Sequence, residues 1–294
     1  MSKPTRGVLL SAFGRRGYGF AAFNMAVSIK ATSPDVEVTL AIDREIYEQL
    51  LPNKYDIFDR IVEIPRNRFY TNRIDPATYK TSIYDFLPYD ETLILDVDGC
   101  VMKDLTPFLD DLSSRDGYIY TDVFGTGGKS DDIRYSIWTS NEYMWELFGL
   151  TDSTILPSIQ SSWMWVRKAD AKEYFDKLQE NYRKGADRTR VNLWGGTLAD
   201  EMFFAGTFAQ MDLIPKIEYE PIFFGNYFSD LSLTELTEKY YVLSLYGNGK
   251  GRKEVKLRYI EFYDRLMREY CNKVGHLHDY KVQYIMADKH LNFG

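Results

Sequence analysis

The 294-residue chain is long enough for one large α/β domain or two small ones, and its 45% hydrophobic and 27% charged residues exclude a disordered protein. The net charge of −7 argues against binding nucleic acid through non-specific phosphate contacts, because such proteins are normally basic. Two cysteines exclude a disulfide framework, and without a signal peptide or an apolar run of about 18 residues we expect a cytoplasmic protein with no integral membrane segment.

The first part of the chain predicts alternating strands and helices. Short apolar runs predict strands at 7–13, 36–42 and 59–64, and helices are expected between them at 20–30 and 44–51. Because parallel strands are joined through helices, this βαβαβ order predicts an α/β fold with a mostly parallel sheet flanked by helices.

The rest of the chain continues this pattern less regularly. We expect irregular structure at 66–75, a glycine-rich mobile loop at 125–132, strands at 91–95, 118–122 and 161–166, and helices at 77–86, 142–147, 168–183, 197–208, 233–241 and 255–272. No repeat or low-complexity linker interrupts the sequence. The economical account is one α/β domain, residues 1–252, with a C-terminal helical extension, residues 253–294, packed on it.

Two carboxylates follow the strand at 91–95. Asp96 and Asp98 flank Val97 and precede Gly99, so a buried strand delivers both to its carboxyl end, where open α/β sheets bind ligands. Carboxylate oxygens suit Mg²⁺ or Mn²⁺, which keep open positions for phosphate oxygens and water. The pair therefore predicts a divalent-metal site that carries a phosphorylated ligand.

One chemistry that uses such a pair is that of haloacid-dehalogenase-like phosphatases, with Asp96 as nucleophile. Asp96-Val97-Asp98-Gly99 matches four positions of the Asp-x-Asp-Gly-Thr motif, with Cys100 where Thr is usual. That motif normally follows the first strand of its domain, whereas a complete βαβαβ unit precedes it here. No later Gly-Asp-x-x-x-Asp pair completes the site, so this reading stays as the alternative.

Four further segments occur in an order that supports another chemistry. Tyr79-Lys80-Thr81 precedes the aspartate pair; Gln160-Ser161-Ser162, Asp200-Glu201 and the segment from Ser244 to Lys250 follow it. Over residues 7–252 the chain resembles GT-A-fold nucleotide-sugar glycosyltransferases. It is most similar to the retaining glycogenin and bacterial galactosyltransferase family, glycosyltransferase family 8. That family has a Lys before its Asp-x-Asp, then Asn-Ser-Gly, Asp-Gln and His-Phe-x-Gly-x-x-Lys.

The resemblance implies an enzyme that moves a hexose or related sugar from a nucleoside diphosphate, UDP by preference, to a hydroxyl with retention. Asp96 and Asp98 would hold Mn²⁺ or Mg²⁺, Asp96 also touching ribose or sugar, and Asp200 or Gln160 would lie beside the reacting sugar. The other contacts to the nucleotide sugar follow from the same resemblance. Lys80 and Lys250 are expected to contact the diphosphate. Ala12, Phe13 and Tyr18, in a strand-end loop, are expected to contact the base, and Asp43 the uracil edge or ribose.

The departures from the family pattern leave some roles open. Ser244 stands where the third metal ligand, a His, is expected, so water or another residue fills that position; the histidines of the chain are His276, His278 and His290. Asp200 is equally explained as a first-turn acid of a helix. A catalytically dead nucleotide-binding module is a further alternative. The acceptor stays open among a sugar, a protein hydroxyl, a lipid carrier and a modified DNA base.

Overall fold

The computed structural model describes residues 4–14, 16–49, 56–69, 76–127, 134–135, 138–193, 197–213, 215–224, 231–245 and 253–276. The chain divides into two compact units. Unit 1 comprises Met1–Thr5, Asn67–Thr92 and Asp116–Glu218, and unit 2 comprises Arg6–Arg66, Leu93–Arg115 and Tyr219–Gly294. The expected boundary at residue 252 stays a prediction.

Unit 2 contains the parallel strands. β1 (Arg6–Ala12), β2 (Glu37–Asp43) and β3 (Arg60–Ile64) pair in the order β3-β2-β1. β4 (Glu91–Leu95), of which Leu93–Leu95 belong to unit 2, follows β1 in the strand order. The central strands are almost fully buried, which explains their continuous apolar sequences. The expected α/β fold, with a mostly parallel sheet flanked by helices, is confirmed.

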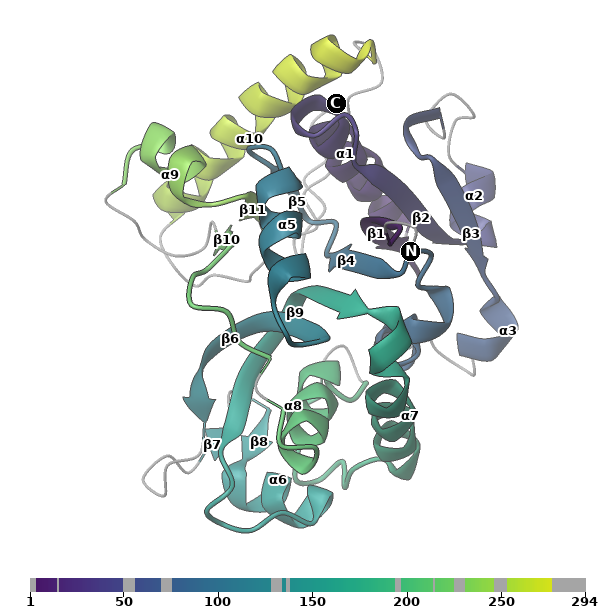
Figure 1. The fold of residues 1–294 in the computed structure, drawn as a ribbon, viewed down its shortest axis with the longest axis vertical. Helices are drawn as coiled ribbons and strands as arrows, with labels where there is room; N and C mark the ends of the chain where they lie inside the picture. The colour runs from purple at the N-terminus through teal and green to yellow at the C-terminus, as the bar shows by residue number, and fades with distance from the viewer. Residues whose placement is uncertain are drawn as a thin grey trace. The chain divides into compact units, whose positions relative to one another are not determined.

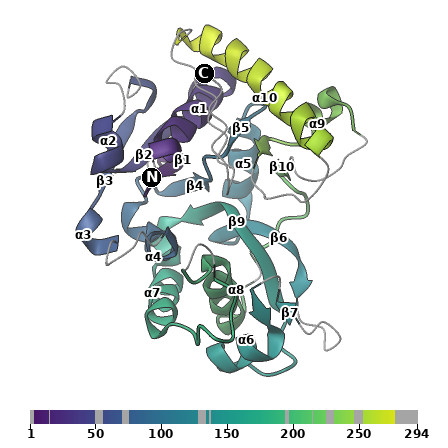
Figure 2. The ribbon, with the colours of Figure 1, turned by 180° about the vertical axis from the view of Figure 1, so that it is seen from behind.

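Helix α1 (Arg16–Thr32) is apolar on nearly all sides because strands and another helix cover it. It contacts β1, β2, β5 (Gly99–Val101) and α10 (Lys253–Val274), and from Phe20 to Ile29 its apolar side chains are all buried. Figures 1 and 2 both show α10 lying along α1. A buried hydrogen bond of 3.2 Å from Asn24 Nδ2 to the Tyr263 hydroxyl joins the two helices.

A small second sheet completes unit 2. β10 (Ile222–Phe224) pairs parallel with β11 (Val242–Ser244), which pairs antiparallel with β5. The remaining helices of this unit are α2 (Arg44–Gln49), α5 (Thr106–Ser114) and α9 (Leu233–Lys239), the last begun by a capping box of Ser232 and Glu235.

Unit 1 is built around an antiparallel strand pair, β6 (Ile119–Gly127) and β9 (Leu156–Arg167). Helix α8 (Asp200–Gln210) packs on β9 and contacts the other helices α4 (Pro76–Thr81), α6 (Asn141–Phe148) and α7 (Lys168–Lys184). Shorter elements are α3 (Arg66–Phe69), which begins at the unit boundary, the 3₁₀ helix η2 (Ile83–Phe86), β7 (Arg134–Tyr135) and β8 (Thr139–Ser140).

Several expected boundaries are wrong. The helix expected at 77–86 breaks at Ser82, because the Thr81 hydroxyl bonds back to the Ala77 carbonyl at 2.9 Å and competes with the regular helix. Residues 125–127 belong to β6 rather than to a loop, since pairing with β9 extends the strand; 128–132 lie outside the described residues. Residues 66–69 form a short helix, and α8 begins at Asp200 rather than at 197.

In the part of the chain that the structure describes, none of the helices has the length and apolar character needed to cross a membrane.

Candidate active site

The aspartate pair lies in the turn between β4 and β5 of unit 2. Val97 is buried, whereas Asp96 and Asp98 on either side of it are half-buried. The Asp98 carbonyl accepts a hydrogen bond of 2.8 Å from the Leu245 backbone N–H. The turn therefore keeps both aspartates at least partly accessible to solvent while their backbone is tied to the end of β11.

Strand β5 is held closely on both sides of this turn. A Cβ atom on Gly99 would lie 2.0 Å from the Leu243 carbonyl oxygen, so only glycine permits the approach of β5 to β11. On its other side, the Val101 N–H donates to the buried Ser28 hydroxyl of α1 at 2.8 Å, and Ser28 donates to the Met25 carbonyl at 2.7 Å. The aspartate turn is thus positioned by backbone contacts at its following strand.

Ser244, at the expected third-ligand position, is 4% exposed. It pairs with Gly99 in the sheet, and Gly99 directly follows Asp98 in the chain. His276 follows α10, where its ring packs edge-on against Phe23 at 5.6 Å between centroids. Lys250, His278 and His290 lie outside the described residues. Within the described ranges, no three His, Cys, Asp or Glu side chains come together as a metal site.

Cys100 stands where the phosphatase motif has Thr, and its surroundings do not suit a metal or phosphate ligand. The side chain is fully buried, and this burial raises the pKa of the Cys100 thiol well above its ordinary value. A protonated thiol in an apolar site is a poor metal ligand.

The expected nucleoside residues gather after β1 and β2. Ala12 and Phe13 are buried, and Gly14 has a φ of 85°, which turns the chain sharply enough for α1 to begin at Arg16. Tyr18 therefore lies in the first turn of α1, half-buried, and not in a strand-end loop as expected.

Asp43 already has several backbone contacts in this region. Its carboxylate accepts hydrogen bonds from the backbone N–H groups of Gly14, Glu45 and Ile46, at 3.2, 2.9 and 3.3 Å. The side chain is 1% exposed. Asp43 thus caps the start of α2 and ties the end of β1 to the end of β2; its role toward uracil or ribose stays a prediction.

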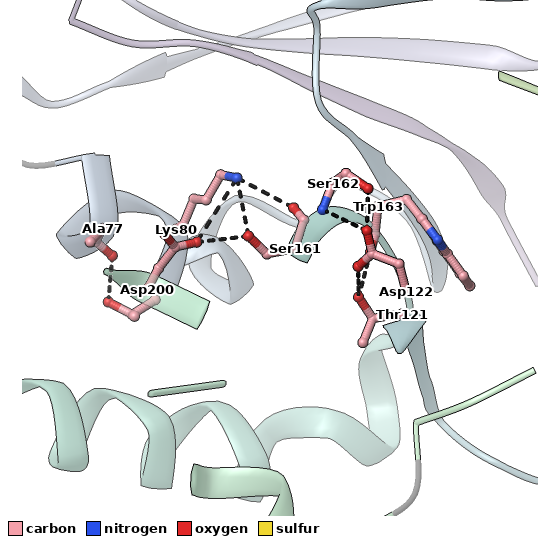
Figure 3. A network of polar contacts seen from close by, with 9 residues as sticks. Ala77, Lys80, Thr121, Asp122, Ser161, Ser162, Trp163 and Asp200 are labelled. Atoms are coloured by element: carbon pink, nitrogen blue, oxygen red, sulfur yellow. Dashed lines mark hydrogen bonds and ion pairs between the residues drawn. The ribbon is translucent and has the colours of Figure 1, made fainter. Parts of the chain in front are cut away.

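In unit 1 the predicted residues Lys80 and Asp200 meet at Ser161, the neighbour of the predicted Gln160 (Figure 3). The Ser161 hydroxyl donates to Asp200 Oδ2 at 2.9 Å, and Lys80 Nζ lies 3.3 Å from the Ser161 carbonyl oxygen and 3.9 Å from Asp200 Oδ2. The Lys80 and Asp200 side chains are 30% and 19% exposed. Asp200 is both a first-turn acid of α8 and a partner in this network, so the two explanations of this residue are compatible.

The network depends on an irregularity of β9. Thr121 pairs with Met164 and Val123 with Ile159, so one residue of β6 faces the four residues 160–163 of β9. Ser161 in this bulge has a φ of 51°, which a serine seldom adopts. Gln160 is half-buried in the same bulge.

The β6 residue that faces the bulge, Asp122, was not identified from the sequence. It is only 7% exposed; its Oδ2 accepts from the Ser162 backbone N–H at 3.2 Å and from the Ser162 hydroxyl, and its Oδ1 lies 3.0 Å from the Thr121 hydroxyl (Figure 3). The one available signal was an aspartate within a strand, where aspartate is disfavoured.

No family model and no curated protein sequence matches the chain. Solved structures do. The apo form of the bifunctional glycosyltransferase WbbM is similar with a TM-score of 0.55 and 13% identity, covering 95% of this chain and 52% of that one, so this chain spans about half of its length.

Two further structures cover 92% of this chain. The galactosyltransferase LgtC in complex with donor and acceptor sugar analogues has a TM-score of 0.52 and 16% identity, with 100% of its own chain covered. The apo glycosyltransferase GlyE of Streptococcus pneumoniae has a TM-score of 0.51 and 14% identity, with 64% covered. At these identities the similarity shows a shared glycosyltransferase fold, and membership of family 8 stays a resemblance.

Proposed function

We propose that this protein is a metal-dependent glycosyltransferase that moves a hexose or related sugar from a UDP-sugar to a hydroxyl acceptor with retention. The observation that carries the proposal is the half-buried Asp96-Val97-Asp98 turn at the carboxyl end of β4, in a fold shared with glycosyltransferases. The carboxyl ends of strands are where open α/β sheets bind ligands.

In unit 2, Asp96 and Asp98 would bind the metal. The two half-buried carboxylates fit Mn²⁺ or Mg²⁺, which are often held by one or two carboxylates, phosphate oxygens and water. When bound, the metal supplies positive charge that stabilises the leaving diphosphate. Lys250 is proposed to contact the diphosphate as well. Ala12, Phe13 and Tyr18 are proposed to contact the nucleoside, with Asp43.

In unit 1, the proposed residues act on the sugar. As the bond from the anomeric carbon to the diphosphate breaks, the sugar ring gains positive charge, and a fixed carboxylate stabilises that charge. Asp200 is proposed for this role, with Gln160 beside the sugar. The hydrogen bond from Ser161 and the ammonium of Lys80 orient the Asp200 carboxylate.

The first experiment measures ligand binding by thermal unfolding. We expect Mn²⁺ with UDP to raise the melting temperature, and Asp98→Asn to remove most of that rise. The control is Asp264→Asn, which removes a carboxylate from an exposed i,i+4 pair with Arg268 on α10 and should respond like the wild type. An equal rise in Asp98→Asn and wild type contradicts the metal assignment.

The second experiment screens UDP-sugars for slow hydrolysis in the presence of Mn²⁺. Hydrolysis of one donor, lost in Asp98→Asn, supports a transferase. Binding without turnover of any donor indicates the dead nucleotide-binding module. Release of phosphate from an aryl phosphate, abolished by Asp96→Asn, indicates the phosphatase alternative.

A further inference from the structure

Asp122 is a buried carboxylate that the proposed reaction does not use. Burying a carboxylate is unfavourable unless hydrogen bonds replace its hydration. Here the Ser162 N–H and the Ser162 hydroxyl donate to Oδ2, and the Thr121 hydroxyl, whose one proton is shared between Oδ1 and the Trp163 carbonyl oxygen, lies 3.0 Å from Oδ1. These hydrogen bonds indicate that the Asp122 carboxylate has a structural role in the strand pair β6–β9.

That place is opposite the bulge of β9. Asp122 is the one residue of β6 that faces residues 160–163, so its side chain takes the place of the ladder hydrogen bonds that the bulge interrupts. Through the Ser162 N–H it holds the backbone next to Ser161, whose φ of 51° persists only where surrounding contacts enforce it. Thr121 completes this support, since its hydroxyl lies 2.6 Å from the Trp163 carbonyl oxygen.

The bulge in turn positions the charged pair. Both the carbonyl and the hydroxyl oxygen of Ser161 lie within 3.4 Å of Lys80 Nζ, and the hydroxyl donates to Asp200. A change in the Ser161 backbone therefore displaces the partners of Lys80 and Asp200 together. Figure 3 shows this continuous path from Asp122 through Ser162 and Ser161 to Lys80 and Asp200.

We infer that Asp122 is a positioning residue: it anchors the β9 bulge and thereby orients Asp200 and Lys80 for the transfer reaction. The catalytic consequence rests on the proposed function, whereas the anchoring of the bulge does not.

The matched pair Asp122→Ala and Asp122→Asn separates positioning from a direct effect of charge. Asparagine keeps the shape: its oxygen can accept from Ser162, and its NH₂ can donate to the Thr121 oxygen while that hydroxyl donates to Trp163. Alanine removes every contact. We expect kcat for UDP-sugar hydrolysis to fall about 100-fold in Asp122→Ala but only a few-fold in Asp122→Asn, because a misplacement of about 1 Å costs roughly that factor.

Binding of Mn²⁺, measured as Kd, should be unchanged in both variants, because Asp96 and Asp98, which are proposed to bind it, belong to unit 2. The control is Asn181→Ala in unit 1, which removes a buried hydrogen bond of 2.9 Å to Thr207 and a partly buried one of 2.7 Å to Gln210 and should lower the melting temperature without changing kcat. If Asp122→Ala does not fold, Ser162→Ala removes one of the donors to Asp122 and should give an intermediate fall in kcat.

Amide hydrogen exchange of a peptide covering residues 158–166 supplies a readout that needs no activity. Exchange should accelerate in Asp122→Ala, or in Ser162→Ala if that variant replaces it, but not in Asp122→Asn or Asn181→Ala. Unchanged exchange in the alanine variant overturns the inference. An equal loss of kcat in Asp122→Ala and Asp122→Asn, with exchange unchanged in Asp122→Asn, also overturns the inference. In that case the charge of the Asp122 carboxylate acts on the reaction directly. If the wild type hydrolyses no donor, the proposed function fails, and the exchange result alone decides whether Asp122 anchors the bulge.

Discussion

The two groups of candidate residues are held in place by different means. In unit 1, Lys80, Ser161 and Asp200 position one another through side-chain contacts supported by Asp122. In unit 2, the Asp96-Val97-Asp98 turn is positioned through the backbone of the strand that follows it. The difference predicts that the unit 1 residues are displaced by substitutions of polar side chains. The position of the aspartate turn should instead be disturbed by substitutions that add volume next to β5 or remove an acceptor of a β5 backbone N–H.

The largest effect is expected from the aspartates themselves. Asp96→Asn and Asp98→Asn should each lower kcat for UDP-sugar hydrolysis by about 10²–10³, the loss typical when one preorganised electrostatic contact to the developing charge is removed. The free energy of unfolding without ligand should change little, since both side chains are half-buried and their turn is held by backbone contacts. Steady-state kinetics and urea unfolding check the two parts separately. A large loss of stability would show that these carboxylates have a structural role like that of Asp122.

Gly99→Ala should be the most destabilising of the conservative changes around the turn. Its methyl group would meet the Leu243 carbonyl at 2.0 Å, and backbone cannot move aside as a side chain can. We expect a loss of about 2–3 kcal/mol in the free energy of unfolding, at the upper end for overpacking. Gly149→Ala, where nothing lies within 4 Å but φ is 62°, is the control for backbone strain without a clash. A Gly99→Ala protein as stable as wild type would contradict positioning by close backbone approach.

Ser28→Ala tests the other side of β5. It leaves the buried Val101 N–H without its acceptor, for which we expect a loss of about 1–3 kcal/mol in urea unfolding. Thr32→Ala on the same helix removes a hydroxyl bonded at 2.8 Å to the Ser28 carbonyl within α1 and should cost less than about 0.5 kcal/mol. Equal losses would mean that the Ser28 bond to β5 contributes nothing specific.

The smallest effect concerns the strained residue of unit 1. Ser161→Gly and Ser161→Ala both remove the hydroxyl bonded to Asp200, but only glycine adopts a φ of 51° without strain. The glycine variant should therefore be more stable than the alanine variant by about 1 kcal/mol, while both lose activity. An alanine variant of equal or greater stability would show that the backbone relaxes there.

β1, β2 and β4 were predictable because each is a mostly buried apolar run with a turn residue after it, whereas β3 is largely exposed and was recognised from its β-branched residues and the Pro65 that follows it. β1, β2, β3 and β4 lie within about one or two residues of expectation, and β4 carries the aspartate turn as expected. In contrast, β5, β10 and β11 have three residues each, too few to show any periodicity.

The sequence allowed most of the candidate-site segments to be identified, but not the contacts between their side chains. Lys80, Ser161 and Asp200 stood in segments quoted for their order, yet only the fold brings the three side chains together. The φ of Ser161 and the role of Asp122 arise from the register between β6 and β9, and a register with a bulge has no signature in either strand alone.

The dependence of α1 on α10 has a consequence for synthesis of the protein. The hydrogen bond from Asn24 to Tyr263 joins residues 239 positions apart, so the ribosome synthesises α1 long before α10, the helix that packs on it. At roughly 5–20 residues per second, the apolar surface that α10 later buries waits about 10–50 s on each nascent chain. During that interval it is a surface to which a chaperone, or another nascent chain, can bind.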